Sequence, residues 1–123
     1  SDPQRVSRIL LTSGKCYYDL AHYRQEHGHD DVAIIRVEEL YPFPHELLLQ
    51  VLSRYSDDVP LTWVQGEPEN MGAWRFLYAL LEGELAGRRL QRASRAASAS
   101  PATGSQHSHR IEQRQLMERA FSV

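Results

Sequence analysis

The residues of this chain that could carry chemistry gather in four short segments, and each segment follows an apolar run. They are "TSGK" at 12–15, "EELYPFP" at 38–44, "QGEPENMGAW" at 65–74 and "SASPATGS" at 98–105. Each segment combines glycine or proline with charged or hydroxyl side chains. Phosphate binding and carboxylate acid–base catalysis are the chemistries that these residue types suggest.

The first segment offers a phosphate site in principle. Gly14 and Lys15 lie where backbone N–H groups and an ammonium group would meet a phosphate at a helix N-terminus. However, the segment has one glycine and matches neither the P-loop nor the dinucleotide-binding fingerprint. We therefore expect an ordinary strand-to-helix turn with Lys15 facing solvent.

Four glutamates belong to the second and third segments: Glu38, Glu39, Glu67 and Glu69. Two facing carboxylates could act as an acid–base pair, but no companion nucleophile or metal ligand is evident beside them. The chain also has no Gly-x-Ser-x-Gly nucleophile elbow. Salt bridges and charges at helix N-termini are the favoured interpretation.

Histidines occur in two pairs, His27 with His29 and His107 with His109. Residues two apart on a helix do not share a face, so we do not expect either pair to hold a metal ion. For His27, at the end of an expected helix, a capping or charge–dipole role is more ordinary.

A basic run precedes the fourth segment and consists of Arg88, Arg89, Arg92 and Arg95. One interpretation is an anion site for a phosphate, a nucleotide or a carboxylate of a partner. The other is a solvated edge strand that its charges protect from pairing with other chains. Both interpretations stay open from the sequence.

Length and composition favour one domain, residues 1–123, in a reducing compartment. The formal net charge is −2 and predicts no general attraction to nucleic acid or membrane surfaces. Cys16 is the only cysteine, so an intramolecular disulfide is impossible and a cysteine-based zinc site is not expected. No apolar run approaches the roughly 20 residues that cross a bilayer.

The elements that must position these segments alternate along the chain. We expect strands at 6–13, 31–40, 59–65 and 88–94, and helices at 15–28, 41–55, 74–85 and 107–121. This alternation predicts a mostly parallel sheet with helices on both faces. In such a sheet the loops after the strands gather at one edge, where ligands and partners usually bind.

The helix ends and faces follow from local signals. We expect Gly28 as a C-cap, Pro44 in a first turn, and Asn70 and Ser108 as N-caps. Trp63 should lie in the core, whereas Trp74 could pack on the sheet edge or on a neighbouring subunit. The expected buried stripes of the last three helices are Leu47, Leu48, Val51, Leu52 and Tyr55; Trp74, Leu77, Leu80, Leu81 and Leu85; and Leu116, Ala120 and Phe121.

The order and spacing of four motifs carry a family resemblance. "SGKCYYDL", "RVEELYPFP", "EPENMGAW" and "SASPATGS" with the following helix resemble the C-terminal domain of the thiamine-diphosphate-dependent decarboxylating component of the 2-oxoglutarate dehydrogenase complex. The resemblance covers the chain from about Val6 to Val123. "R-x-E-x-L-x-P-F-P" is general to transketolase-like C-terminal domains, whereas the last two motifs together are specific to the 2-oxoglutarate branch and its 2-oxoadipate relatives.

The resemblance implies a transketolase C-terminal fold. That fold is α/β, a three-layer α/β/α arrangement with a mostly parallel, mixed sheet of five strands, one of them antiparallel. Four of the strands are visible in the sequence, so a fifth should be short or lie at an end.

The resemblance also implies a role within a larger, homodimeric, multidomain enzyme of the tricarboxylic acid cycle. That enzyme decarboxylates 2-oxoglutarate on thiamine diphosphate with magnesium, and passes succinyl to the lipoyl arm of the succinyltransferase component. In the family the cofactor is held by other domains. This chain has no "GDG" signature and none of the family's catalytic histidine motifs, so we assign it no catalytic, cofactor or metal residue and do not expect it to decarboxylate alone.

We expect the chain to support the enzyme instead, by packing on other domains and on the second subunit. "SASPATGS" should be an ordered loop at the same sheet edge as "EPENMGAW". The candidate interface residues are Gly14, Lys15, Glu38, Tyr41, Glu67, Asn70, Trp74, Arg95, Ser98, Ser100, Pro101, Thr103 and Gly104.

Two other classes of function fit the same residues. One is a free-standing module that binds a nucleotide or coenzyme A through the loop edge and the arginine run. The other is a docking protein that uses the same edge to contact a partner enzyme. For location, bacterial cytoplasm and mitochondrial matrix both suit a reduced chain, and the content of arginine and alanine favours bacteria.

Overall fold

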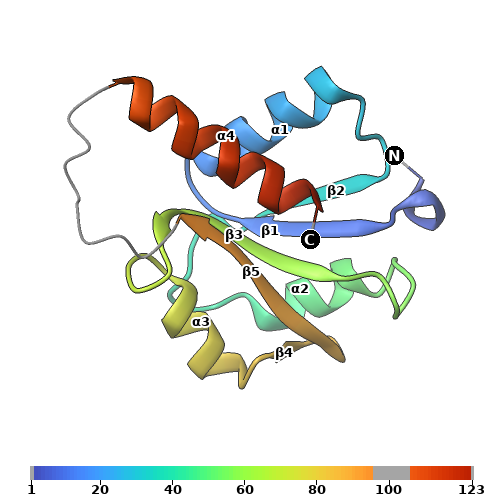
Figure 1. Ribbon diagram of the computed structural model, residues 1–123. Coiled ribbons are helices and arrows are strands. Elements are labelled where there is room, and N and C mark those ends of the chain that lie inside the picture. Colours follow the sequence, from blue (N-terminus) through green and yellow to red (C-terminus); the bar gives the residue numbers. More distant parts are fainter. Residues whose placement is uncertain (1, 96–105, 123) are drawn as a thin grey trace.

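Five strands form one sheet between two pairs of helices (Figure 1). The computed structural model describes residues 2–95 and 106–122. The elements in chain order are a 3-10 turn η1 (Pro3–Arg5), β1 (Arg8–Thr12), α1 (Cys16–His27), β2 (Val32–Arg36), α2 (His45–Leu52), β3 (Leu61–Pro68), α3 (Trp74–Leu81), β4 (Glu84–Leu85), β5 (Arg88–Arg95) and α4 (Gln106–Ser122).

The strand order is β2-β1-β3-β5-β4, with β1 in the interior of the sheet. Leu10 of β1 pairs in parallel register with Ile34 of β2 on one side and with Thr62 of β3 on the other. β5 is parallel to β3, and the two-residue β4 is antiparallel to β5. The predicted three-layer fold with a mixed sheet is confirmed, and the expected fifth strand is β4 at the sheet edge.

The central strands are apolar at nearly every position because both of their faces are covered. Ile9 and Leu11 point to the helices α2 and α3, which form the α2/α3 layer. Leu10 points to the opposite face, where α1 and α4 form the α1/α4 layer. All three leucine and isoleucine side chains are fully buried, so each face of the sheet has its own hydrophobic core.

Each layer is anchored by residues predicted for the core. In the α1/α4 layer, Leu116, Ala120 and Phe121 of α4 are buried. In the α2/α3 layer, Trp63 of β3 is buried together with Leu77 of α3. The helix–sheet–helix arrangement of Figure 1 therefore follows from two apolar surfaces that alternate along the same strands.

The helix ends differ in part from the local signals. Gly28 ends α1 in the left-handed conformation, as predicted. Pro44 precedes α2, which begins at His45. The prediction of Asn70 as an N-cap is wrong, since Ala73 occupies that position before α3. Ser108 is not an N-cap either, because α4 already begins at Gln106.

Three apolar residues lie elsewhere than the helical periodicity predicts. Leu47 and Leu80 were expected in buried stripes, but their side chains are 61% and 50% exposed. Leu85 is buried, but it belongs to β4 and not to the third helix. The helix ends at Leu81 because Glu82 takes positive φ and Gly83 follows it, which turns the chain into the β4–β5 pair.

In the part of the chain that the structure describes, none of the helices combines the length and the apolar character that crossing a bilayer requires.

Candidate functional site at the loop edge of the sheet

The four parallel strands end at the same edge of the sheet, as the sequence predicts for its polar segments. Thr12, Arg36, Pro68 and Arg95 are the last residues of β1, β2, β3 and β5. A cavity of about 700 Å³ lies there, between the loop edge and the first turns of α1 and α4. Of the candidate interface residues, this loop-edge cavity brings together Gly14, Lys15, Tyr41, Glu67 and Arg95.

The other candidates lie beside the cavity or outside the description. Glu38 and Asn70 are exposed and do not line it. Trp74 begins α3 and is partly buried against the core of the α2/α3 layer. Residues 96–105 lie outside the described residues, so the expectations for Ser98, Ser100, Pro101, Thr103 and Gly104 stay predictions.

The loop between β3 and α3 is organised by Gln65, a buried residue that the sequence analysis did not single out. Its side-chain oxygen Oε1 accepts hydrogen bonds from Trp63 Nε1 at 2.9 Å and from the Trp74 backbone N–H at 3.0 Å. Its amide nitrogen donates to the carbonyls of Pro68 and Met71, both at 2.7 Å. One side chain therefore fixes the path of the whole "GEPENMGA" loop.

Gly72 allows the loop between β3 and α3 to pass close to the Gln65 side chain. It has φ +68°, and a Cβ there would lie 3.1 Å from Oε1 of Gln65 and of Glu67. A side chain at this position would combine an unfavourable backbone conformation with displacement of the Gln65 amide. The glycine of "ENMG" is thus required by the hydrogen bonds of Gln65.

Thr12 at the end of β1 and Cys16 at the start of α1 are uncharged residues at this edge of the sheet. Thr12 donates a buried hydrogen bond of 2.8 Å to the carbonyl of Val64, which ties the ends of β1 and β3 together. Cys16 lines the cavity at the start of α1, and burial raises the pKa of its thiol to about 11. At neutral pH the thiol is therefore protonated and is a poor nucleophile.

Two arginines at this edge, Arg92 and Arg95, are paired with acidic residues. Arg92 forms an ion pair with Glu69, and its guanidinium carbon lies 5.9 Å from the centre of the Trp74 ring. Arg95 donates to Glu112 at 3.3 Å and to Gln113 at 3.2 Å, which holds α4 against the end of β5. For Glu69, the interpretation as a salt-bridge residue is confirmed.

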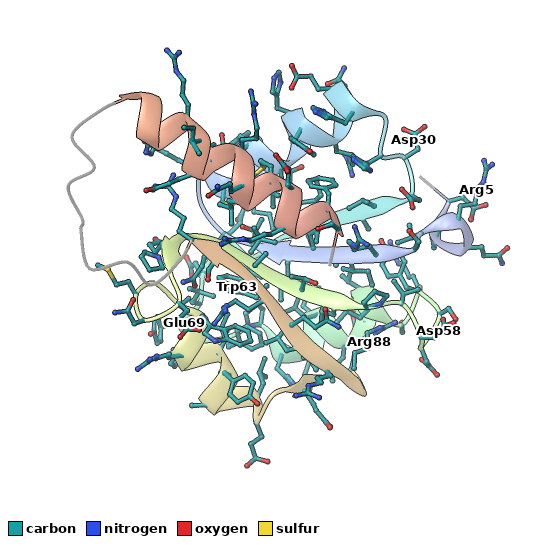
Figure 2. The ribbon with its side chains drawn as sticks, in the orientation of Figure 1. Arg5, Asp30, Asp58, Trp63, Glu69 and Arg88 are labelled. Carbon is teal, nitrogen blue, oxygen red and sulfur yellow. The ribbon has the colours of Figure 1, made fainter. Side chains whose placement is uncertain are left out.

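The arginine run is divided between different partners. Arg88 is buried and donates to the carbonyls of Leu52, Tyr55, Ser56 and Val59, at the C-terminal end of α2 and beyond it. In Figure 2 Glu69 lies beside the start of α3, whereas Arg88 lies toward the other end of the strands. The run therefore does not form one basic surface, and β4 pairs with β5 only at Arg88 and Arg89, so the rest of that side of β5 has no pairing strand among the described residues.

The histidines near the end of α1 are involved in aromatic packing. His27 stacks on Tyr23 with ring centres 4.0 Å apart, and His29 lies 4.8 Å from the ring of Phe121. Across residues 2–95 and 106–122, no three carboxylate, imidazole or thiol side chains come close enough together to hold a metal ion. The loop edge thus combines the hydrogen-bonded loop around Gln65 with the loop-edge cavity.

Comparison with known proteins identifies relatives of the whole chain. The family model described as 2-oxoglutarate dehydrogenase C-terminal matches residues 1–121. The 2-oxoglutarate dehydrogenase E1 component of Cupriavidus necator is 43% identical over 96% of this chain, and that of Azotobacter vinelandii is 43% identical over 99%. The E1 component of Haemophilus influenzae is 44% identical over 98% of the chain. The chain spans only 12–13% of the length of these relatives.

Proposed function

Because the chain belongs to the 2-oxoglutarate dehydrogenase C-terminal family, we propose that it is the accessory, dimer-supporting domain of a thiamine-diphosphate-dependent 2-oxoglutarate dehydrogenase. In this proposal the chain provides a rigid platform on which larger domains and a second subunit pack. The parent enzyme oxidatively decarboxylates 2-oxoglutarate and passes succinyl to the lipoyl group of a succinyltransferase partner. In the alternative assignment, the parent enzyme is the homologue that acts on 2-oxoadipate.

The observation that carries the proposal is the coverage of the comparison. The chain matches its relatives almost from end to end at 43–44% identity, yet it corresponds to 12–13% of their length. A segment of that size holds a small part of such an enzyme. The hydrogen bonds of Gln65 and the paired charges around Arg92 and Arg95 support a structural role, because these side chains tie the loops and α4 to the sheet.

Thiamine diphosphate with magnesium is the cofactor that the family implies, and the residues that the structure describes do not fit it. A magnesium-bound diphosphate needs oxygen ligands, and in the described ranges no group of three acidic, histidine or cysteine side chains is placed to hold a cation. The thiol of Cys16 is protonated at neutral pH because burial raises its pKa. We therefore assign no chemical step to these residues.

The proposed location is the bacterial cytoplasm. The E1 components that resemble the chain come from bacteria such as Azotobacter vinelandii and Haemophilus influenzae. The single cysteine, Cys16, fits a reducing compartment. For a eukaryotic chain the corresponding location is the mitochondrial matrix.

The coding sequence upstream of Ser1 tests the proposal. We expect an in-frame continuation that contains a thiamine diphosphate motif, and loss of dimer and of 2-oxoglutarate decarboxylation when residues 1–123 are deleted from that longer polypeptide. If the reading frame starts at Ser1, the proposal requires a split subunit, and mixing the two polypeptides must restore decarboxylation. A deletion that leaves an active dimer contradicts the proposal.

A further inference from the structure

Helix α3 is apolar almost all the way round. Its sequence is "WRFLYALL", in which Arg75 is the only charged residue. The inner side is covered by the sheet, since Leu77 is fully buried. The outer side is not covered, since Tyr78 is 46% and Leu80 is 50% exposed. A helix that is hydrophobic on all sides is normally buried on all sides, so the outer face of α3 lacks a partner among residues 2–95 and 106–122.

The same face continues into a groove. The segment 40–43 lies against α3, and the rings of Tyr41 and Phe76 are 4.5 Å apart. Together they enclose a cavity of about 580 Å³, here called the α3 groove, whose apolar lining is Leu40, Tyr41, Phe43, Phe76, Leu80 and Leu81. Tyr41 is 70% exposed at its mouth. Exposed apolar surface of this kind marks binding sites for other protein segments.

One end of the α3 groove is acidic. Glu82 and Glu84 line it, at the turn where α3 ends and β4 begins. His45 and Tyr41 are the other titratable residues among those that line the groove, and neither adds a negative charge at neutral pH. The groove thus combines an apolar floor with a negative rim, which favours an apolar segment that carries positive charge beside it.

We propose that the α3 groove binds an apolar segment flanked by lysine or arginine, which belongs to the part of the same polypeptide outside these 123 residues. This rests on the proposed function, because it requires that the chain be part of a longer protein. The length of the relatives supports it, since 87–88% of each lies outside the matched segment. A second copy of the chain is disfavoured, because a symmetric contact through this face brings two acidic rims together.

Photo-crosslinking in the full-length polypeptide tests the proposal. Benzoylphenylalanine is placed at Leu80, and in a control protein at Ile111 of α4, whose side chain is 46% exposed on the opposite layer. We expect the Leu80 variant to crosslink to a segment of the same polypeptide outside residues 1–123, with lysine or arginine beside the linked residue. The Ile111 variant should give at least about tenfold less of that product.

Each alternative result overturns the proposal. A crosslink from position 80 to α3 of a second copy identifies a contact between copies of the chain, and a crosslink to another protein identifies an external partner. Equal, low yields from both positions mean that the α3 groove is open to solvent. The coding sequence upstream of Ser1 is read separately, so failure of the proposed function is recognised independently of the crosslinking result.

The role of the acidic rim is tested by charge removal. The double variant Glu82→Gln with Glu84→Gln should lower the crosslinking yield from position 80 about threefold at low salt. This decrease should fade at 1 M salt, because screening removes the contribution of the rim in the parent protein as well. A yield that is unchanged at low salt contradicts the expected basic flanks of the partner segment.

Discussion

The two helical layers bury their inner faces equally well but present different outer faces. Leu116 in the α1/α4 layer and Leu77 in the α2/α3 layer are 1% and 0% exposed. On the outside, the large apolar side chains that the structure shows exposed are unevenly distributed. Tyr41, Leu47, Met71, Tyr78 and Leu80 lie on α2, α3 or the loops leading into them, and Tyr18 and Ile111 lie on the α1/α4 layer.

This difference separates two kinds of information in the sequence. The inward-facing pattern determines how helices pack on the sheet, and it is satisfied in both layers. The outward-facing composition indicates what each layer meets. Charged and polar residues such as Glu26 and Arg114 are exposed on the α1/α4 layer, which suits water. The outer side of the α2/α3 layer, which carries most of the exposed large apolar side chains, suits contact with protein.

Core truncations test the equality of the inner faces and have the largest expected effect. Leu77→Ala and Leu116→Ala should each lower the free energy of unfolding by about 3 kcal/mol, because each leaves a cavity in a fully packed core. Urea unfolding of the two purified variants measures both values. If Leu77→Ala costs less than about 1 kcal/mol while Leu116→Ala shows the full loss, α3 is loosely held and the two inner faces are not equivalent.

The C-terminal end of α2 is stabilised by Arg88 of β5, which donates hydrogen bonds to carbonyls at that end and beyond it. The described contacts of α1 include no such arginine at its C-terminal end. Arg88→Met should lower the free energy of unfolding by about 2–3 kcal/mol, because it removes the donor that Arg88 supplies to the carbonyls of Tyr55 and Val59. The matched control is Arg89→Met, at the neighbouring exposed position, with an effect within about 0.5 kcal/mol. Equal losses in the two variants contradict the capping role.

The α1/α4 layer contains the Cys16 thiol, which makes the free energy of unfolding depend on pH at high pH. Between about pH 9 and 11 the unfolded chain loses the Cys16 proton while the folded chain retains it, since burial raises the folded pKa to about 11. The folded state then binds more protons, so the free energy of unfolding falls as pH rises through this window, by up to about 2 kcal/mol.

The Cys16→Ser variant isolates that contribution, because a serine hydroxyl does not titrate in this range. We expect the difference in unfolding free energy between the parent chain and the variant to change with pH above 9 and to be constant below about pH 8. The rate of thiol alkylation at pH 8 should also be roughly a hundredfold below that of an ordinary cysteine. A pH-independent difference shows that the thiol is not desolvated.

Two glycines with similar backbone conformations give the smallest expected effects. Gly72 has φ +68° and Gly14 has φ +64°, but a Cβ would meet Gln65 only at Gly72. Gly14→Ala should cost about 1 kcal/mol from backbone conformation alone, and Gly72→Ala about 2 kcal/mol because the Gln65 amide must also move. Equal costs in thermal unfolding mean that the loop before α3 adapts without the hydrogen bonds of Gln65.

The sequence predicted the element order, the parallel strands and the shared loop edge. These follow from apolar periodicity and from helix-ending glycines such as Gly28. It misplaced Leu85, since the spacing of Leu77, Leu81 and Leu85 continues a helical face through the turn at Gly83. It predicted a buried Leu80 side chain, because the sequence pattern does not distinguish an apolar residue that is buried within its own chain from one that contacts another protein segment.

The N-cap of α3 shows why the site was harder to predict than the fold. Asn70 has the side chain that usually accepts an N-terminal N–H of a helix. The acceptor for the Trp74 N–H is instead Gln65, nine positions earlier. A contact of that span depends on the turn of the whole loop, so no local pattern signals it. The sequence shows only that a glutamine ends the apolar run "VPLTWVQ".

The strand order has a consequence for how the chain emerges during synthesis. In the order β2-β1-β3-β5-β4, β2 joins β1 on one side, β3 joins it on the other, and the β4–β5 pair then extends the sheet from β3. No strand has to be inserted between two that are already paired. A nascent chain leaving the ribosome can therefore add β2, β3 and then the β4–β5 pair to an existing edge, and α4, which follows the other described helices in the chain, then closes its face of the sheet.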